Sequence, residues 1–461
     1  MSKENQVAAI ILAAGDGTRM KSSRAKPLHE VAGRSLLGHA LKATEVLGAA
    51  STVVVTAPGA SAVAAEVARA CPDAMIAEQA ERLGTGHAVR MAEPALADFD
   101  GDAVVLFADT PFISPETLGA MRDALAQGAA VVALGFEAAD PTGYGRMIAE
   151  GTRLDRIVEH KDASDAERTV TLCNSGVIAA DAALLFALLS QVGNDNANGE
   201  YYLPDVVGLA RAAGHECAVV RCHEDETLGV NSRADLAKAE GVFQSRARRA
   251  AMADGVTLID PATVWFSYDT ELARDVLVEP NVVFAPGVQV AEGARIRAHS
   301  HLEGCRVAPD AVIGPYARLR PGANIGAGAK VGNFVEVKNA VFGEGAKANH
   351  LAYVGDADVG AGANIGAGVV TCNYDGVMKH RTTIGQGAFV GTNSSLVAPV
   401  KLGEGAYVAS GSVITRDVAA DALAITRAKQ MEKPGFVARF RSKLLAIKAA
   451  QADKPAAKKG D

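Results

Sequence analysis

The chain has 461 residues, which at about 150 residues per domain predicts two to four domains. Charged residues make up 21% and the AVILMFWYC set 49%, a composition that argues against disorder across most of the chain. The formal net charge of −7 argues against an overall basic surface for nucleic acid, and no apolar run approaches the roughly 18–20 residues of a membrane helix. Glycine is abundant, with 47 residues, and aromatic residues contribute only 5%, which indicates many tight turns around a narrow core.

Cysteine spacing and the N-terminal segment both bear on localisation. The six cysteines are scattered without a C-x-x-C pair, as is typical of reduced thiols in a cytoplasmic protein. The apolar segment 7–14 is short for a signal peptide and runs directly into Gly15-Asp16-Gly17. We therefore interpret it as a first strand that feeds a loop.

Residues 1 to about 230 alternate short apolar runs with amphipathic segments. This alternation predicts an α/β domain with a largely parallel sheet that is covered on both faces. Ligands of such sheets bind beyond the carboxyl ends of the strands, so the loops after Leu12 and Phe107 are the first candidate sites. The predicted strands are 7–12, 51–56, 103–107 and 130–134, and the predicted helices include 36–47 and 62–70.

The second half of the chain has a six-residue period. A segment from Ser232 to about Met252, rich in Ala, Arg, Lys and Glu, predicts a helix that joins the halves, with Asn231-Ser232 at its start. From about residue 255 an apolar residue recurs every sixth position in successive blocks, which is typical of a parallel β-helix with these side chains inside. The recurring residues are Val278, Phe284, Val290, Ile296, Leu302, Val307, Ile313, Leu319, Ile325, Val331, Val337, Phe342, Ala348, Val354, Val359, Ile365, Thr371, Ile384, Val390, Leu396, Leu402, Val408 and Ile414.

Two segments depart from this repeat. An interruption at 372–383 predicts a loop on one face of the β-helix, which is either part of a binding face or a neutral surface loop. Residues 431–461 are basic and contain two prolines. We expect a short helix near 436–446 and disorder over the last dozen residues, and the basic charge serves either solubility or contact with phosphate.

The loop after the first predicted strand reads Leu12-Ala-Ala-Gly-Asp-Gly-Thr-Arg-Met20. It lacks the lysine of a Walker loop, and Met20 stands where the dinucleotide fingerprint needs its last glycine. Two glycines nevertheless let backbone N–H groups approach an anion. Arg19 and Lys26 follow closely and could neutralise a triphosphate.

These residues resemble the signature of sugar-phosphate nucleotidylyltransferases. Together with the hexapeptide half, residues 6–430 resemble the bifunctional N-acetylglucosamine-1-phosphate uridylyltransferase/glucosamine-1-phosphate N-acetyltransferase family of bacterial cell-wall synthesis. Further strings that carry the resemblance are 83–88 (LGTGHA), 141–146 (PTGYGR), 157–163 (IVEHKDA) and 229–231 (GVN). The implied fold is a Rossmann-like α/β nucleotidylyltransferase domain (1–231), a linker helix (232–253), a left-handed parallel β-helix (254–430) and a basic, partly disordered tail (431–461).

The resemblance implies a uridylyl-transfer site in the first half. Arg19 and Lys26 would stabilise the α-phosphorus of UTP as the sugar phosphate displaces pyrophosphate. Asp109 and Asn231 would hold Mg²⁺, although each has a plainer alternative: Asp109 could cap its turn and Asn231 could cap the linker helix. Ala108 departs from the family, which usually has Gly before this Asp. The nucleotide-binding and sugar-binding residues would be Leu12, Ala13, Ala14, Gly15, Lys26, Gln79, Gly84, Thr85, Asp109, Gly145, Glu159, Asn174 and Asn231.

The resemblance also implies an acetyl-transfer site in the β-helix. His350 would act as the general base, although a lone histidine is often structural. The acceptor sugar phosphate would contact Arg320, Lys338, Tyr353 and Asn364. Acetyl-CoA would contact Ala367, Asn373, Tyr374, Thr392, Ser410 and Arg427, where Thr392 and Ser410 stand in place of the usual Ser and Ala.

The leading hypothesis is a cytoplasmic homotrimeric enzyme with active sites between subunits. It acetylates glucosamine 1-phosphate with acetyl-CoA and then joins N-acetylglucosamine 1-phosphate to the uridylyl group of UTP with Mg²⁺, for peptidoglycan and lipopolysaccharide synthesis. We expect neither nucleic acid nor stable membrane association. The alternatives are a monofunctional nucleotidylyltransferase with a structural β-helix and a non-catalytic nucleotide-sugar-binding scaffold.

Overall fold

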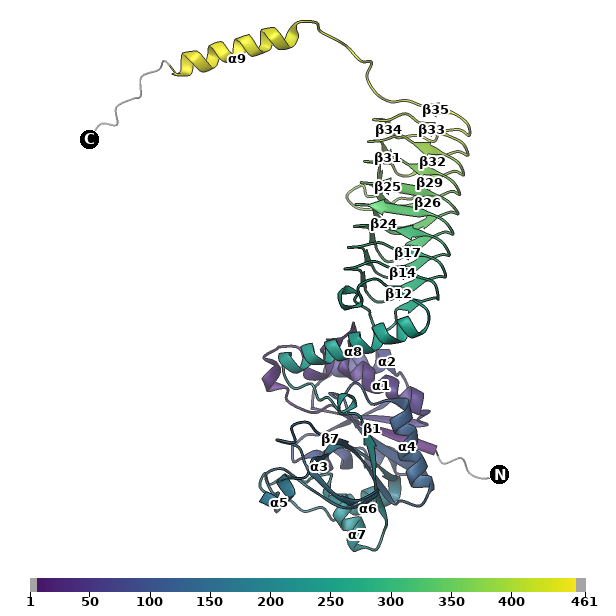
Figure 1. Cartoon of the computed structure of the whole chain (residues 1–461). Coiled ribbons are helices and arrows are strands. Elements are labelled where there is room, and N and C mark those ends of the chain that lie inside the picture. The colour runs from purple at the N-terminus through teal and green to yellow at the C-terminus, as the bar shows by residue number, and fades with distance from the viewer. Residues whose placement is uncertain (1–5, 453–461) are drawn as a thin grey trace, which may run out of the picture. The chain divides into compact units, whose positions relative to one another are not determined.

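A computed structural model describes residues 6–452, which divide into two compact units between Cys305 and Arg306. The first unit contains a sheet with the strand order β5-β4-β1-β6-β10-β7-β11-β9-β8. Two of its strands, β1 and β7, are labelled in Figure 1. The strands are β1 (Gln6–Leu12), β4 (Ser51–Thr56), β5 (Met75–Glu78), β6 (Gly101–Phe107), β7 (Val131–Glu137), β8 (Arg146–Glu150), β9 (Arg153–Val158), β10 (Leu172–Asp181) and β11 (Cys217–Cys222).

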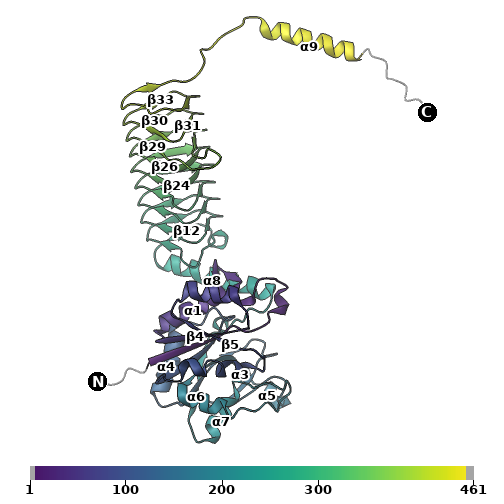
Figure 2. The same cartoon turned by 180° about the vertical axis from the view of Figure 1, so that it is seen from behind.

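Helices cover both faces of this sheet (Figure 2). Because successive side chains of a strand point to opposite faces, Ala8 and Ile10 of β1 pack into one apolar cluster and Val7 and Ile11 into another. The first cluster includes residues of α3 (Thr85–Arg90), α6 (Ala182–Leu189) and α7 (Asp205–Ala212), and the second includes residues of α1 (Leu36–Leu47), α2 (Ser61–Ala70) and α4 (Pro115–Ala126). The short helix α5 spans Asp165–Arg168.

The predicted elements of the first half are confirmed, but the sheet is mixed rather than largely parallel. The strand predicted at 51–56 and the helix predicted at 36–47 have the bounds of β4 and α1. β10, however, runs antiparallel to both β6 and β7. A strand that is buried on both faces has a continuous apolar sequence in either direction, so the pattern could not distinguish the two arrangements.

In the first unit, the chain enters a parallel β-helix after the linker helix α8 (Arg233–Ala253). Residues at equal register are 18 positions apart, as in the pairs Leu277 with Arg295 and Val283 with His301. The strands are β12 (Thr257–Leu258), β13 (Glu271–Leu272), β14 (Leu277–Val278), β15 (Val283–Phe284), β16 (Gln289–Val290), β17 (Arg295–Ile296) and β18 (His301–Leu302).

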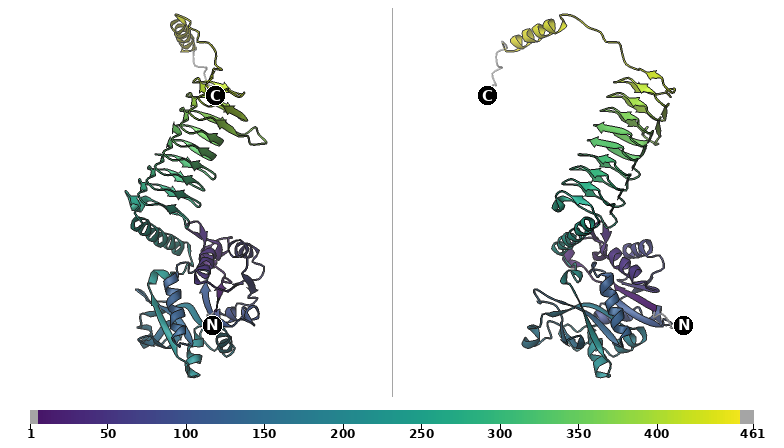
Figure 3. Two further views of the ribbon diagram at one scale, coloured as in Figure 1. Left: turned by 90° about the vertical axis from the view of Figure 1, so that its right-hand side faces the viewer. Right: turned by 45° about the vertical axis from the view of Figure 1, so that its right-hand side comes forward.

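The second unit consists of further coils, stacked in Figure 3 as successive turns, and a C-terminal helix. Every apolar residue of the predicted six-residue period is buried in the two units, so the β-helix interpretation is confirmed. The strands are β19 (Arg306–Val307), β20 (Val312–Ile313), β21 (Arg318–Leu319), β22 (Asn324–Ile325), β23 (Lys330–Asn333), β24 (Glu336–Phe342), β25 (Lys347–His350), β26 (Tyr353–Val359), β27 (Asn364–Ile365), β28 (Val370–Cys372), β29 (Thr382–Ile384), β30 (Phe389–Val390), β31 (Ser395–Val397), β32 (Val400–Leu402), β33 (Tyr407–Val408), β34 (Val413–Ile414) and β35 (Leu423–Ala424).

Two of the irregular steps in the repeat are places where a strand continues through a corner. β24 and β26 each turn at a residue in the left-handed region, Asn339 with φ 45° and Asp356 with φ 46°. Asn339 Nδ2 donates a hydrogen bond to Asp356 Oδ1 at 2.6 Å, and Asn373 Nδ2 donates to Asp356 Oδ2. These three residues therefore form a polar column along one corner.

The C-terminal helix α9 spans Phe436–Ala452, so it is confirmed and longer than expected. It includes Ala450, where the sequence predicted disorder, and the remainder of that segment lies outside the described residues. Among residues 6–452, none of the helices combines the length and apolar character needed to cross a membrane.

The linker helix begins as predicted and is fastened to the first coil by one buried side chain. The Ser232 side chain caps α8, and Asp235 completes a capping box with it. Gln244, which is only 1% exposed, accepts a hydrogen bond from Phe266 N at 2.9 Å and donates one to Phe266 O at 2.7 Å. The Gln244 amide thus forms the two hydrogen bonds that a neighbouring strand would otherwise form with the Phe266 backbone.

We expect Gln244→Ala to destabilise the protein by about 2–4 kcal/mol, because it leaves the buried N–H and C=O of Phe266 without partners. Thermal unfolding followed by circular dichroism measures the effect. Gln127→Ala, at an exposed position after α4, is the matched control and should leave Tm unchanged. Equal melting of the two variants would show that the Gln244 amide does not hold the linker.

Candidate functional site

A cavity of about 240 Å³ lies beyond the carboxyl ends of β1 and β6, the edge that the sequence singled out. Parallel pairing brings Leu12 and Phe107, the last residues of these strands, side by side. The lining residues are Leu12, Ala13, Ala14, Gly15, Lys26, Pro27, Gln79, Arg82, Gly84, Thr85, Ala88, Phe107, Ala108, Asp109 and Glu200. The structure therefore gathers nine of the predicted nucleotide-site residues around one cavity.

The glycine-rich loop adopts its course because of one close approach. Gly17 has φ 59°, and a Cβ placed there would lie 2.5 Å from the Cβ of Lys26. Only glycine therefore allows η2 (Lys26–Leu28) to approach the loop and bring Lys26 to the cavity. Ala108 N donates to Leu12 O at 3.1 Å, and its backbone lies outside the left-handed region, so alanine fits where the family usually has glycine.

A second segment, 79–85, forms the opposite wall. Gln79, only 5% exposed, donates from Nε2 to Gly84 O at 3.1 Å and lies 3.1 Å from His87 Nδ1. Gly84 has φ 111°, and a Cβ there would lie 2.6 Å from Tyr201 O. Thr85 Oγ1 accepts a hydrogen bond from Leu203 N at 3.1 Å. This wall is thus held by hydrogen bonds between side chains and the backbone, and His87 lies beside the Gln79 amide.

Three side chains from distant parts of the chain meet at the Lys26 ammonium. Lys26 Nζ lies 2.5 Å from Asp109 Oδ2 and 2.8 Å from Asn231 Oδ1. A backbone bond from Val230 N to Asp109 O, 2.9 Å long, fastens the two loops together. Ser232 caps the N-terminus of α8. The Asn231 side chain therefore does not cap the helix, and its amide oxygen instead accepts the hydrogen bond from Lys26.

The same two oxygens suit a divalent cation. One carboxylate oxygen and one amide oxygen converge on a single positive centre, and Mg²⁺ takes oxygen ligands while usually keeping several waters. Asp109 and Asn231 therefore fit the ion that the family resemblance implies. Among residues 6–452, no group of three or more His, Cys, Asp or Glu side chains could hold a metal ion by itself.

The remaining predicted sugar contacts form a neighbouring cluster. Asn174 N donates to Gly145 O at 2.9 Å, and a Cβ on Gly145 would lie 3.1 Å from Glu159 Oε1. Burial, followed by the charges of Asp205, Asp162 and Glu200, raises the pKa of Glu159 above its usual value. Since Glu200 also lines the cavity, this cluster lies close to the cavity wall.

One predicted residue lies apart, and two charged lining residues were not predicted. Arg19 is exposed on η1 (Thr18–Met20), and it does not belong to the described residues that line the cavity. Arg82 and Glu200 do line it, and Arg82 pairs with Asp16 of the glycine-rich loop. Arg82 lies only three residues after the predicted site residue Gln79, and this proximity could have marked it as a candidate.

In the second unit, parallel register brings predicted acceptor residues together. The pairing of Leu319 with Val337 places Arg320 beside Lys338, and Glu336 pairs with Tyr353 in the next coil. Arg320 Nη1 donates to Glu336 Oε1 at 2.7 Å.

A cation that the sequence analysis did not name completes this group. Contact with the Lys379 ammonium, and then the charge of Arg320, lowers the pKa of Lys338. Burial alone would raise the pKa of Asp356, but hydrogen bonds from Asn339 and Asn373 reverse the shift, helped by the two lysines. Lys379 belongs to the interruption 372–383, so the break in the repeat was the signal that could have found it. The cluster presents three cations to a common region, as an anion-binding site requires.

His350 ends β25 and is exposed. Its Nδ1 lies 2.6 Å from Asn333 Oδ1, the residue at the same register one coil earlier. With that oxygen as acceptor, Nδ1 carries the proton and Nε2 is the basic nitrogen. Asn364 lies in the next coil of the same ladder, at the register of Lys347.

Four of the six predicted acetyl-CoA residues form a column near one end of the β-helix. Pairing of Ile365 with Val390 and of Val390 with Val408 places Ala367, Thr392 and Ser410 at corresponding corners of successive coils. Arg427 Nη1 donates to Ser410 O at 2.7 Å. Asn373 and Tyr374 stand apart from this column, in the interruption between β28 and β29.

Comparisons with known proteins agree with both halves. Residues 9–170 match the MobA-like NTP transferase domain, and residues 381–416 match the bacterial transferase hexapeptide (six repeats), the repeat of left-handed parallel β-helices. The chain is 56% identical over 446 residues to the bifunctional protein GlmU of Roseobacter denitrificans, an alignment that covers 97% of this chain and 99% of the relative.

Two further relatives are of similar closeness. The GlmU protein of Cereibacter sphaeroides is 58% identical over 446 residues, covering 96% of this chain and 98% of the relative. That of Sphingopyxis alaskensis is 54% identical over 452 residues, covering 98% and 100%. The cavity beyond β1 and β6, the cation cluster on the coils and this full-length similarity lead to one conclusion: the chain belongs to the family of bifunctional GlmU proteins.

Proposed function

We propose that this chain catalyses both reactions of its family, uridylyl transfer in the first unit and acetyl transfer in the second. The observation that best supports two activities is that each half of the chain has its own cluster of polar side chains. One is the cavity beyond β1 and β6, with Lys26, Asp109 and the adjoining Asn231, and the other is the His350–Asn333 pair with its neighbouring cations. A purely structural β-helix has no need of the latter, so the bifunctional reading is preferred to a monofunctional one.

In uridylyl transfer, the cavity holds UTP with backbone N–H groups of the loop after β1, while Gln79 and Thr85 enclose the base. A phosphate oxygen of N-acetylglucosamine 1-phosphate attacks the α-phosphorus, the bond to the β-phosphate oxygen breaks, and pyrophosphate leaves. Lys26 stabilises the negative charge that develops. Arg19 reaches the phosphates from the rim, and Gly145, Glu159 and Asn174 contact the sugar.

Mg²⁺ would be held by Asp109 and Asn231 and would neutralise charge on the phosphates. Lys26, which contacts both of these oxygens in the structure, would then be free to bind the α-phosphate. Lys26 and Asp109 both line the cavity, so both side chains can reach a bound nucleotide.

In acetyl transfer, Arg320, Lys338 and Lys379 bind the phosphate of glucosamine 1-phosphate, while Tyr353 and Asn364 orient the sugar. The amine nitrogen attacks the thioester carbonyl carbon of acetyl-CoA, the C–S bond breaks, and the coenzyme leaves as its thiolate. His350 Nε2 accepts the amine proton. Acetyl-CoA extends along the column of Ala367, Thr392 and Ser410 to Arg427, with Asn373 and Tyr374 beside the acetyl group.

We further propose a homotrimer, working in the cytoplasm, whose subunits meet at an apolar stripe beside His350. Tyr316, Phe334 and Leu351 are 48%, 56% and 59% exposed, and all three have positive φ. A left-handed backbone conformation at a bulky residue costs about 1–3 kcal/mol of folding free energy. An exposed apolar patch is also unfavourable in water and often marks an interaction surface. Burial against other subunits offsets both costs and would place His350 at the interface.

The functional boundaries that we propose are 1–231 for uridylyl transfer, 232–253 for the linker helix, 254–430 for acetyl transfer and 431–461 for the basic tail. They are supported by the start of α8 at Arg233, after the Asn231 that completes the first site, and by the first coil strand at Thr257.

Asp109→Ala should lower the rate of pyrophosphate release by at least about hundredfold, because it removes a charge that positions both Lys26 and the metal ion. Acetyl transfer should be unchanged, since its residues belong to the other unit. Coupled assays of pyrophosphate and thiol release measure the two reactions separately. Asp123→Ala, on the surface of α4, is the matched control. Unimpaired uridylyl transfer by Asp109→Ala would remove this residue from the site.

His350→Ala should lower acetyl transfer by about 10²–10⁴-fold, the usual contribution of a general base, and leave uridylyl transfer intact when N-acetylglucosamine 1-phosphate is supplied. Asn333→Ala should lower acetyl transfer by a smaller factor, because the ring loses its tautomer-setting partner. Thermal unfolding is the control. If His350→Ala lowered Tm without slowing acetyl transfer, the histidine would be structural.

Phe334→Glu combined with Leu351→Glu should convert the trimer to monomers, since two charges cannot be buried at the interface. Acetyl transfer should fall with trimer content, whereas uridylyl transfer should persist. Sedimentation velocity measures the assembly. The control is Val46→Glu, at an exposed apolar position on α1. A trimer that survives the double substitution would locate the interface elsewhere.

A further inference from the structure

The first unit contains a second, larger cavity of about 670 Å³, outside the site described above. It lies among η2, the hairpin of β2 (Glu30–Val31) and β3 (Arg34–Ser35), helices α1 and α2, and Tyr268 at the start of the coils. The volume is sufficient for a phosphorylated sugar. None of the predicted substrate contacts lines it.

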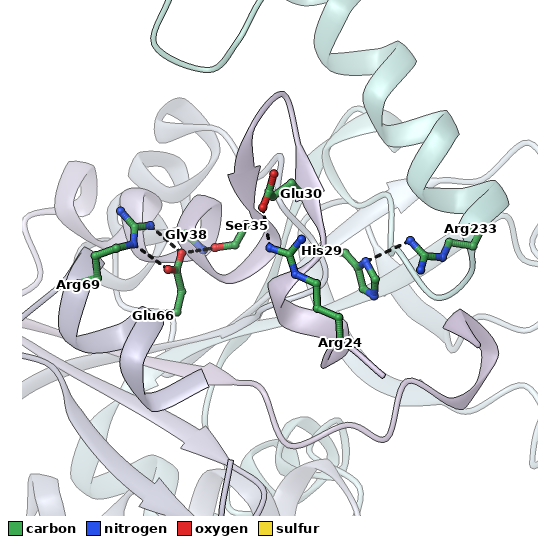
Figure 4. Close-up of polar contacts among 8 residues, drawn as sticks. All are labelled: Arg24, His29, Glu30, Ser35, Gly38, Glu66, Arg69 and Arg233. Atoms are coloured by element: carbon green, nitrogen blue, oxygen red, sulfur yellow. Dashed lines mark hydrogen bonds and ion pairs between the residues drawn. The ribbon is translucent and has the colours of Figure 1, made fainter. Parts of the chain in front are cut away.

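Charged side chains dominate this second cavity. Its basic lining residues are Arg24, Arg34, Lys42 and Arg69, and its acidic ones are Glu30, Glu45 and Glu66. Each carboxylate is paired: Arg24 lies 2.5 Å from Glu30, Lys42 lies 2.7 Å from Glu45, and Arg69 lies 2.8 Å from Glu66. Figure 4 shows the first and third of these pairs on neighbouring elements. Four cations against three anions leave one positive charge in excess.

The excess charge is that of Arg34. Its guanidinium carbon lies 4.0 Å from the centre of the Tyr268 ring, and within residues 6–452 it forms no ion pair with a carboxylate. A guanidinium stacked on a ring has a fixed plane, and its edge N–H groups can bind two oxygens of one oxyanion. Tyr268 is itself held by a bond from its N to Ala32 O at 2.9 Å.

The wall beside Arg34 is also built for polar contact. Ser35 Oγ accepts a hydrogen bond from Gly38 N at 2.9 Å and donates one to Glu66 Oε1 at 2.5 Å. The hydrogen bond from Arg69, followed by that from Ser35, lowers the pKa of Glu66 although burial opposes the shift. The carboxylate is therefore ionised and can accept hydrogen bonds from ligand hydroxyls.

The two cavities share a wall. The three-residue helix η2 presents Lys26 and Pro27 to the nucleotide cavity and Leu28 to the second cavity. Arg24, which lines the second cavity, is two residues from Lys26. A ligand that draws Arg24 away from Glu30 would therefore move the segment that positions Lys26.

We propose that the cavity around Arg34 and Tyr268 is a binding site for a hydroxylated phosphate monoester, and that its occupancy alters uridylyl transfer through η2. The phosphate binds the stacked Arg34 guanidinium, with Arg24 as a second cation, and the carboxylates accept bonds from the hydroxyl groups. The coupling to uridylyl transfer rests on the proposed function of the nucleotide cavity, whereas the binding site does not.

Isothermal titration of the full chain with glucose 6-phosphate tests the binding. Saturating UDP-N-acetylglucosamine and Mg²⁺ occupy the nucleotide cavity during the titration. We expect one equivalent per chain, with Arg34→Gln weakening binding by about tenfold to hundredfold and Arg34→Lys by less, since lysine keeps the charge but loses the fork. Arg295→Gln, at an exposed position on β17, is the matched control. Absence of saturable binding, or equal affinity in Arg34→Gln, would overturn the site.

Initial rates of uridylyl transfer, with and without glucose 6-phosphate, test the coupling. We expect the probe to change the rate at least twofold in the natural chain and to leave Arg34→Gln unaffected, while the two chains have equal rates without the probe. A rate that does not respond would overturn the coupling across η2. If the natural chain shows no uridylyl transfer without the probe, the proposed function fails, and the titration still decides the binding site.

Discussion

Parallel pairing of backbone segments is the constraint on which both halves of this molecule depend. In a parallel ladder every strand ends at the same edge, and residues at equal register lie side by side however far apart they are in sequence. In the first unit this brings Leu12 next to Phe107 and opens the nucleotide cavity beyond them. In the second it sets Arg320 beside Lys338 and Asn333 beside His350. The side chains of each site are therefore brought together by the hydrogen bonds that pair parallel strands.

The two sites use this constraint in different ways. In the cavity beyond β1 and β6, the decisive contact joins Lys26 and Asn231, which are 205 positions apart. A backbone bond from Val230 N to Asp109 O fastens the loop of Asn231 to the loop of Asp109. On the β-helix the corresponding contacts join residues 17 or 18 positions apart, because each coil repeats the last. A solenoid can therefore build a site from nearly local sequence, whereas the α/β domain needs its whole fold.

Irregularities in the repeat coincide with the polar groups to which we assign function. The β-helix continues strands through corners at Asn339 and Asp356, and the polar column that results holds Asn373 at the base of the interruption. That interruption supplies Lys379 to the cation cluster. In solenoids, departures from the repeat form loops on one face, which is often the binding face. The left-handed apolar residues Phe334 and Leu351 directly follow Asn333 and His350, which links the proposed assembly to the proposed catalysis.

The sequence by itself determined the two fold classes, the linker helix and the loop after β1, because periodicity and glycine spacing are local properties. Its resemblance to a known family named residues of which nine line one cavity in the structure, while Arg19, Asn373 and Tyr374 lie apart from the other predicted residues. Only the tertiary structure decided that β10 runs antiparallel, since burial on both faces conceals strand direction. Only it showed that Ser232 rather than Asn231 caps α8, that Arg82 and Lys379 join the sites, and that Arg34 lies over Tyr268. Each of these depends on which distant segments meet, and that is fixed by long-range packing rather than by any local pattern.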